Sequence, residues 1–246
     1  MNRCFLPADR WGQPEAELSA EESHHLAGVL RAQAGQRIGL LDGAGRTGEA
    51  EVVAPHKKHT RIRILSRQQA PANVPRRILA QALVREQQMD WLIQKAVELG
   101  VHEIWPLQTD HAVVKVQAED GGKKVARWQS VALAACKQSG NPWLPTIRPV
   151  QKLAGALAGL PPAPAAACFG ALQSGAMPLP AYLTGLRQAV CSTITMFIGP
   201  EGDFSQAEVA AMLAAGVQPV TFGPLIFRVE TAALFILSAV HYAWMK

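Results

Sequence analysis

Acidic residues are missing from two long segments of this 246-residue sequence. No Asp or Glu occurs from Pro55 to Arg77, which carries seven Lys or Arg, or from Gly121 to Pro200, which carries another seven. These segments together hold more positive charge than the whole chain's formal net charge of +5. A basic surface attracts polyanions, so nucleic acid is the first candidate partner, although composition alone fits a solvated basic face of an ordinary domain equally well.

Cysteine is scarce, and its four residues, Cys4, Cys136, Cys168 and Cys191, form no C-x-x-C pair. This spacing argues against a disulfide framework or a zinc ribbon, and it favours a reducing, cytoplasmic compartment and no metal site. The H-E-x-x-H, G-x-S-x-G and Walker motifs are also absent. Their absence argues against a metalloprotease, an α/β-hydrolase and a P-loop NTPase.

Long apolar runs are lacking as well. None follows Arg3, so we expect no signal peptide. The most apolar segment, Val229–Met245, is short for a bilayer and carries Glu230 and His241, which predicts a buried helix and no membrane association. With 49% hydrophobic and 17% charged residues, the composition is globular and excludes a wholly disordered chain.

Short strands dominate the pattern up to about residue 70. Ile38–Asp42 and Gly48–Val53 flank a glycine-rich turn, which predicts a hairpin, and Thr60–Leu65 alternates Arg with Ile as a two-faced strand does. Ser19 and Glu22 have the spacing of a capping box at the start of a short helix. A small β-barrel with one short helix is the simplest prediction for this part.

Strands and helices alternate from residue 71 onward. The expected strands are Ile78–Val84, Glu103–Leu107, Ala165–Phe169, Thr193–Ile198 and Gln218–Phe222, and the expected helices are Met89–Leu99, Arg127–Gln138, Leu153–Leu160, Ser205–Ala215 and Glu230–Ala243. This alternation predicts a mostly parallel sheet covered by helices. We therefore expect two domains, a basic barrel at residues 1–70 and an α/β domain at residues 71–246.

Two motifs in the first domain carry no chemistry in our interpretation. Gly43–Gly48 matches G-x-G-x-x-G by letter, but the glycines lead into another strand and no acid follows about twenty residues later, as a dinucleotide site requires. The adjacent His24 and His25 point in different directions on a helix, so we expect a structural pair and not a metal site.

The few acids of the C-terminal half gather in two loops. After Gly121 the sequence has only Glu201, Asp203, Glu208 and Glu230. Glu201 lies in a Gly-Pro-Glu-Gly turn behind an expected strand, and the carboxyl ends of parallel strands are where α/β proteins bind ligands. Phe222–Pro224 follows the last expected strand and leads to Glu230. Both acids could instead be helix caps, but the spacing favours a functional site here.

These two loops resemble a known family. Ile198–Ser205 (IGPEGDFS) and Phe222–Ala232 (FGPLIFRVETA) are similar to the paired signature of the 16S ribosomal RNA uridine-N3 methyltransferases of the RsmE type, a branch of the SPOUT methyltransferases. Further similar segments are His24–Gly35, Met89–Gly100 and Ala135–Gly140. The resemblance runs in order along nearly the whole chain.

The resemblance implies a fold, a reaction and partners. The fold is a PUA-like RNA-binding β-barrel followed by a SPOUT α/β methyltransferase domain with a deep trefoil knot. The reaction is methylation of N3 of one uridine of 16S ribosomal RNA, U1498, with S-adenosylmethionine (SAM) as cofactor. The implied partners are the 30S ribosomal subunit and a second copy of the chain, as a homodimer.

The resemblance also implies a set of site residues. The SAM cup would use Leu172, Ile198, Gly199, Pro200, Glu201, Gly202, Phe222, Gly223, Ile226, Phe227 and Arg228. We expect Arg228 to stabilise the uridine anion and Glu201 to orient groups in the cup or accept a proton, although Arg228 could equally be an ion-pair partner of Glu230. The basic residues expected to bind RNA are Arg31, Lys57, Lys58, Arg61, Arg63, Lys95 and Lys137.

The sequence departs from the family at three positions. His111, Asn141 and Leu225 stand where the family usually has arginine, which affects the expected RNA contacts more than the cofactor pocket. Two alternatives therefore stay open: a non-catalytic protein of the same fold that binds ribosomal RNA or assists ribosome assembly, and an enzyme that acts on a different small substrate.

Overall fold

A computed structural model of the protein describes residues 1–173 and 175–245, without the side chain of residue 118. The chain divides into two compact units. The first unit comprises Met1–Ala72 and Leu133–Leu144, and the second comprises Asn73–Ala132 and the chain from Pro145 onward. Residues 133–144 thus group with the first unit, whereas the division expected from the sequence, at residue 70, places them in the second domain.

The first unit is built on a six-stranded sheet. Its strands are β1 (Arg3–Phe5), β2 (Glu15–Glu17), β3 (Arg37–Leu41), β4 (Arg46–Ala54), β5 (Arg61–Ile64) and β6 (Gln68–Gln69), and its helical segments are a 3₁₀ turn, η1 (Ala8–Gly12), the helix α1 (Ala20–Ser23) and a π-helical turn, η2 (His24–Val29). The strand order is β1-β3-β4-β5-β2, with β6 paired to β4, and every pair except β1 with β3 is antiparallel.

Alternating side chains give this sheet its core. Along β5, Ile62 and Ile64 are buried while Arg61 and Arg63 are exposed, as the sequence pattern predicts. The isoleucines join a cluster that includes Trp11 from η1. The turn between β3 and β4 contains the G-x-G-x-x-G match and is a hairpin, as predicted.

The predicted capping box at the start of α1 forms only by half. Ser19 Oγ accepts a hydrogen bond of 3.2 Å from the Glu22 amide. The Glu22 carboxylate does not return to Ser19 but accepts a 2.6 Å hydrogen bond from Lys137 Nζ. Because Glu22 is buried, an ion pair satisfies its charge better than a single backbone amide would.

The second unit contains a seven-stranded sheet in which all paired strands are parallel. The strands are β7 (Arg76–Ala82), β8 (Glu103–Leu107), β9 (Thr146–Ile147), β10 (Ala165–Gly170), β11 (Met177–Pro178), β12 (Thr193–Ile198) and β13 (Gln218–Thr221). The helices are α2 (Glu86–Glu98), α3 (Ala118–Ser139, whose residues from Leu133 onward belong to the first unit), α4 (Leu153–Ala158), α5 (Leu179–Gln188), α6 (Gln206–Ala214) and α7 (Val229–Ala243). The sheet confirms the predicted α/β class.

Helices cover the sheet and bury alternate residues of its strands. α4 packs on β8 and α6, and their side chains share a core with β7, β8, β10 and β12. Trp105 and Phe197 are its largest fully buried side chains. α7 packs on β7, β12, α2 and α5. It buries Ile236, Leu237 and Val240, so the apolar C-terminal segment is a core helix, as predicted. No helix within the described residues is long and apolar enough to cross a membrane.

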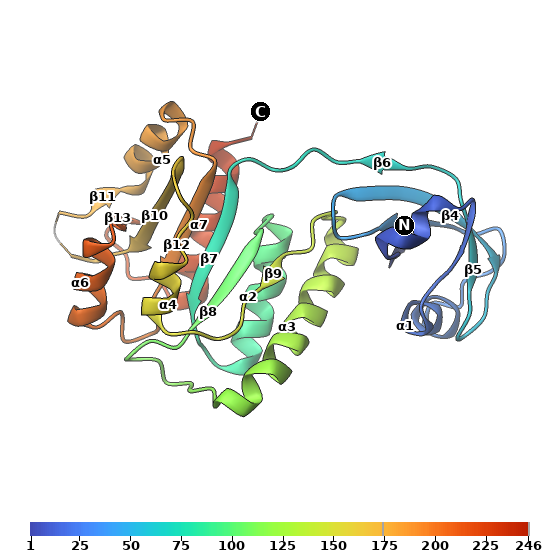
Figure 1. Ribbon diagram of the computed structural model, residues 1–246, viewed down its shortest axis with the longest axis horizontal. Coiled ribbons are helices and arrows are strands. Elements are labelled where there is room, and N and C mark those ends of the chain that lie inside the picture. Colours follow the sequence, from blue (N-terminus) through green and yellow to red (C-terminus); the bar gives the residue numbers. More distant parts are fainter. Residues whose placement is uncertain (174, 246) are drawn as a thin grey trace. The chain divides into compact units, whose positions relative to one another are not determined.

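The strand order is not the chain order. β12 lies between β10 and β7 at the centre of the sheet, and β13 pairs on the far side of β10 (Figure 1). After β13 the chain therefore returns past β10 to place α7 against β12 and β7. A trefoil knot in this region stays a prediction.

Candidate functional site

Three loops of the second unit enclose a cavity of about 470 Å³. They follow β10, β12 and β13, so all three lie at the carboxyl ends of neighbouring parallel strands. This is the edge at which open α/β sheets bind ligands, because the strand-end loops can diverge there without disturbing the sheet. The cavity lies at the place where the sequence predicts a site.

Most of the residues predicted for the cofactor cup line this cavity. They are Leu172, Ile198, Gly199, Pro200, Glu201, Phe222, Gly223, Ile226, Phe227 and Arg228. Gly202 is not among the lining residues, and a Cβ added to it would lie 3.3 Å from the His111 Cβ. Gly202 therefore faces the loop after β8.

Eight lining residues are not among those predicted for the cup, although the sequence had already drawn attention to Glu230 and Leu225. They are Gln88, Gly170, Ala171, Asp203, Leu225, Val229, Glu230 and Ala232. The strand-end rule alone could have found Gly170 and Ala171, which end and follow β10. Gln88 lies on α2, more than eighty residues before the first of the three loops, and no sequence signal connects it with them.

The loop after β12 is held in a compact turn. Asp203 adopts a left-handed backbone conformation with φ of 59°, its amide donates to the Pro200 carbonyl at 3.0 Å, and its Oδ1 accepts from the Phe204 amide at 2.8 Å. A Cβ at Gly199 would lie 3.2 Å from the Phe204 ring. A larger residue at Gly199 would therefore push this turn outward.

The start of α6 anchors the same loop. Ser205 and Glu208 form the predicted capping box, with the Ser205 amide donating to Glu208 Oε2 at 2.9 Å. Asp110 joins them, since its amide donates to Glu208 Oε1 at 3.1 Å and its Oδ2 accepts from Ser205 Oγ at 2.6 Å. The C-terminal end of the turn is thus fixed to α6 and to the loop after β8.

The loop after β13 is supported by aromatic packing. The ring centroids of Phe222, Phe227 and Phe235 lie 5.2 to 6.3 Å apart, so the two loop residues share one cluster with α7. A Cβ at Gly170 would lie 3.1 Å from the Phe222 ring. The glycine at the end of β10 lets the two loops approach each other across the cavity.

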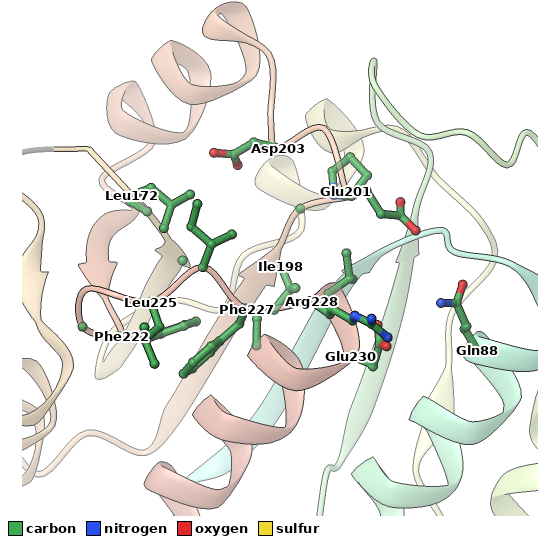
Figure 2. Close-up of a pocket in the computed structure, with 18 residues that line it drawn as sticks. Gln88, Leu172, Ile198, Glu201, Asp203, Phe222, Leu225, Phe227, Arg228 and Glu230 are labelled. Carbon is green, nitrogen blue, oxygen red and sulfur yellow. The ribbon is translucent and has the colours of Figure 1, made fainter.

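Most of the polar side chains lie at one end of the cavity. Figure 2 shows Leu172, Phe222 and Leu225 at one end, Glu201, Arg228, Glu230 and Gln88 at the other, and Asp203 on the side of Leu172. At the apolar end large aliphatic side chains are uncovered, and Ile226 is 81% exposed. Uncovered apolar surface in a concave site indicates a ligand with an apolar face.

Arg228 is the cationic side chain of the polar end. It is the N-cap residue of α7 and is exposed. Within residues 1–173 and 175–245 its guanidinium has no ion-pair or hydrogen-bond partner, so it does not pair with Glu230. The described residues also contain no cluster of three or more His, Cys, Asp or Glu that could hold a metal ion.

Two of the three residues at which the sequence departs from the expected arginines make hydrogen bonds within the chain. His111 Nδ1 lies 3.0 Å from the Gly202 carbonyl oxygen and 3.1 Å from that of Asp203, and it can only donate to them. Asn141 Oδ1 accepts from the Trp143 amide at 3.0 Å. Leu225 lines the cavity. His111 therefore stabilises the turn after β12.

The residues expected to bind RNA fall into two groups. Arg31, Lys57, Lys58 and Arg61 belong to the first unit and are exposed, and their side chains have no ion-pair or hydrogen-bond partner among the described residues. The other three are in ion pairs: Arg63 with Glu15 at 3.0 Å, Lys95 with Glu98 at 2.8 Å and Lys137 with Glu22 at 2.6 Å. The Lys137 side chain is only 19% exposed.

Acids from elsewhere in the chain neutralise much of the two acid-free segments. In the first segment Arg76 pairs with Glu103, Arg63 pairs with Glu15, Arg67 donates to two backbone carbonyls and Arg77 is buried. In the second segment the paired residues are Lys123, Lys124, Arg127, Lys137 and Arg148. The absence of acids from a segment of the sequence therefore does not make the surface around that segment free of acids.

Comparisons with known proteins give the family. The RNA methyltransferase domain matches residues 71–241, and the RNA methyltransferase PUA domain matches residues 18–65. The ribosomal RNA small subunit methyltransferase E of Bacillus subtilis is 28% identical, over 98% of this chain and 96% of that protein.

Two solved structures have the same fold. The ribosomal RNA small subunit methyltransferase E of Neisseria gonorrhoeae, bound to SAM, is 28% identical with a TM-score of 0.88, over 99% of this chain and 98% of that one. A Legionella pneumophila methyltransferase in complex with SAM has the same identity, TM-score and coverage. With its PUA domain, its parallel-sheet domain and the cavity between three strand-end loops, the chain belongs to the RNA methyltransferase family of the RsmE type.

Proposed function

We propose that this enzyme transfers a methyl group from SAM to N3 of one uridine of 16S ribosomal RNA, U1498. One observation carries the proposal: the strand-end cavity joins an apolar end to a polar end that contains an unpaired arginine. The first end suits a nucleoside cofactor, and the second suits a substrate that becomes an anion. The names of the relatives support the same assignment.

The lining residues fit SAM in three ways. Leu172, Phe222 and Ile226 offer apolar surface to an adenine ring, and the backbone from Ile198 to Glu201 offers amide and carbonyl groups to polar atoms of the cofactor. Gly170 and Gly199 leave room for the rings of Phe222 and Phe204, and Gly223 adopts a φ of 110° that favours glycine. When bound, SAM supplies a methyl group on a positively charged sulfur, which makes that carbon electrophilic.

The protein must help the uridine to lose its N3 proton. Neutral uridine is a poor nucleophile at N3, because the lone pair needed for the new N–C bond is held in the N–H bond. In our proposal the Glu201 carboxylate accepts that proton, and the Arg228 guanidinium stabilises the negative charge that is shared between N3 and the two carbonyl oxygens of the uracil. The N3 lone pair then forms the bond to the methyl carbon as the carbon–sulfur bond breaks.

The first unit holds the RNA in this proposal. Arg31, Lys57, Lys58 and Arg61 are the candidates for phosphate contacts, because no acid of the described chain competes for them. Arg63, Lys95 and Lys137 would first have to leave their ion pairs. The natural substrate is the 30S subunit or its 16S RNA, in the cytoplasm.

We also propose that the enzyme is a homodimer whose interface covers α5 and α7. Leu179, Leu183, Phe235 and Tyr242 line a second, largely apolar cavity of about 640 Å³ between these helices, and Tyr242 is 79% exposed. Apolar surface of this extent on a charged chain supports association with a second copy.

Mass spectrometry of 16S RNA tests the proposed reaction. RNA from cells that lack this protein should lose one N3-methyluridine, and purified protein with SAM should restore it on 30S subunits from those cells. Calorimetry with SAM separates the non-catalytic alternative, which predicts no cofactor binding. An unchanged modification pattern in the deletion strain would refute the proposed reaction.

A further inference from the structure

Gln88 is an uncharged polar lining residue to which the proposed reaction gives no role. It lies in the first turn of α2 and contributes to the cavity from outside the three strand-end loops. Figure 2 shows its carboxamide turned toward the polar end of the cavity, where Glu201, Arg228 and Glu230 lie. An uncharged amide thus shares a small space with one cation and two carboxylates.

The carboxamide of Gln88 has no hydrogen-bond partner among the described residues. Its Oε1 is buried and unpaired, and no hydrogen bond from its Nε2 joins it to the described chain. A buried polar atom without a partner destabilises the folded chain, so most such atoms are satisfied in folded proteins. The buried unpaired atom is the acceptor oxygen, and a half-turn about the last side-chain bond exchanges it with the Nε2 donor. A carboxamide without a partner in the wall of a cavity indicates a group whose partner is the ligand.

Uracil has two carbonyl oxygens beside the atom that reacts. N3 lies between C2=O and C4=O, and when the N3 proton leaves, the negative charge is shared with both oxygens. A hydrogen-bond donor at each oxygen stabilises this charge during the reaction. Arg228 can donate to one oxygen, and Glu201 and Glu230 can only accept while they are ionised. The second oxygen is therefore left without a donor from these three side chains.

We propose that Gln88 supplies the missing donor: its Nε2 hydrogen-bonds one carbonyl oxygen of the target uracil while Arg228 serves the other. This assignment rests on the proposed function and adds a residue that recognises the base. Cytosine presents an amino group where uracil has O4, so two donors flanking N3 favour uracil. Gln88 also strengthens its hydrogen bond as charge develops, which lowers the barrier for transfer.

Four variants of the full-length protein test the role of Gln88. Gln88→Leu removes the amide at similar size, Gln88→Lys keeps only donors, and Gln88→Glu keeps only acceptors. Gln87→Leu is the matched control, because Gln87 is the preceding residue of α2, is exposed and is not a lining residue of the cavity. For each protein, kcat, KM for 30S subunits lacking the methyl group, and the Kd of SAM are measured.

The donor role predicts a specific order of activities. Gln88→Leu should lower kcat about 10- to 100-fold with the Kd of SAM changed less than about 3-fold, Gln88→Glu should be worse, and Gln88→Lys should recover part of the loss. Gln87→Leu should match the wild type. The rate profile of Gln88→Leu should also move to higher pH, because the bound uridine loses its proton less readily.

Different outcomes overturn different claims. If Gln88→Leu keeps the wild-type kcat, or if SAM affinity falls as much as kcat does, Gln88 does not recognise the uracil. Equal activities of the Lys and Glu variants would exclude a donor role. If the wild type itself transfers no methyl group to the subunits, the proposed function fails, and the variants are not needed to show it.

Discussion

Arg228 is the residue on which the proposed chemistry depends most. Its guanidinium has no partner in the described chain and lines the polar end of the cavity. Removal of one donor that stabilises a developing anion costs about 10²- to 10³-fold in kcat. We expect Arg228→Ala to lose activity by this factor in single-turnover assays with 30S subunits, with the Kd of SAM nearly unchanged. Arg228→Lys should be intermediate, because lysine keeps the charge and loses the planar fork.

An Arg228→Ala enzyme that binds SAM and RNA normally and keeps the full rate would remove Arg228 from the reaction. Glu201→Gln and Glu230→Gln complete the comparison, since both carboxylates line the same end. If Glu201 accepts the proton, Glu201→Gln should lower kcat by a factor that shrinks as the pH rises, because hydroxide can then remove the N3 proton. Glu230→Gln should keep the pH dependence of the wild type.

His102 makes folding sensitive to acid. Burial, together with the charges of Arg77 and Arg76, lowers the pKa of His102 from 6.5 to about 4, and its Nδ1 accepts from the Arg77 amide at 3.1 Å. Between these two values the unfolded chain binds a proton that the folded chain does not. The free energy of unfolding should therefore fall as the pH drops from 6.5 toward 4, by about 2 kcal/mol from this residue.

Urea unfolding at pH 7 and pH 4.5 measures this contribution. His102→Asn cannot titrate, so it should lose less stability than the wild type between the two pH values, whatever the other groups contribute. Equal losses in both proteins would show that His102 does not couple folding to pH.

At the same scale, the sequence located some site residues and not others. Glu201 and Arg228 stand in loops that follow strands, so motif and strand-end position together led to the cavity they line. Gln88 has an ordinary position in an amphipathic helix. Only the packing of α2 and α7 brings it to the cavity, and packing between distant segments leaves no local pattern.

At the scale of elements, the exposed loop between β4 and β5 and the start of β5 are the best candidates for RNA contacts. Lys57, Lys58 and Arg61 lie there without partners. Lys57→Ala combined with Lys58→Ala should weaken binding to 16S RNA and lower the slope of log K against log salt by about 1.5 to 2, as two lost phosphate contacts require.

A second pair of adjacent lysines provides the control. Lys123 and Lys124 lie on α3 in ion pairs with Asp120 and Glu86. Lys123→Ala combined with Lys124→Ala removes the same charge, but it should leave the salt slope unchanged in filter-binding titrations. If both double variants lower the slope equally, the overall positive charge of the protein attracts the RNA, and the loop between β4 and β5 makes no specific contribution.

Several elements escaped prediction for identifiable reasons. α3 begins at Ala118, nine residues before the expected start at Arg127. The sequence did not reveal this first part of the helix, because Gly121 and Gly122 interrupt the helical pattern. α5 starts beside two prolines and contains Gly185, so its sequence resembles a loop. The expected helices and strands with clear periodicity were found, while two-residue strands such as β9 have no periodicity to detect.

At the scale of the whole molecule, the order of strands is what the sequence leaves open. The alternation of strands and helices predicts a parallel sheet, but it does not predict that β12 lies between β10 and β7 or that β13 pairs beside β10. That order is what brings the ends of β10, β12 and β13 together around one cavity. Loops that share a site must lie on neighbouring strands, and neighbours are set by long-range pairing.

In our proposal the cofactor cavity depends on dimerisation, which is a property of the whole molecule. The cavity between α5 and α7 includes Phe222 and Gly223, which also line the cofactor cavity. A second copy that covers α5 and α7 would therefore hold one wall of the cup in place. Loss of the dimer should weaken SAM binding even though the substituted residue does not touch the cup.

Tyr242→Asp tests this dependence, because it places a charge on the apolar surface of α7 at a residue that is 79% exposed. Truncation of a central interface residue costs about 2 kcal/mol or more, so the dimer Kd should rise at least about 30-fold, and a buried charge adds to the loss. Sedimentation velocity should show a monomer where the wild type is a dimer, and calorimetry should show weaker SAM binding.

Val113→Asp is the control, since Val113 is 75% exposed and lines neither cavity. A Tyr242→Asp protein that sediments as the wild type does would place the interface elsewhere, and a monomer that binds SAM as tightly as the dimer would separate the cup from association.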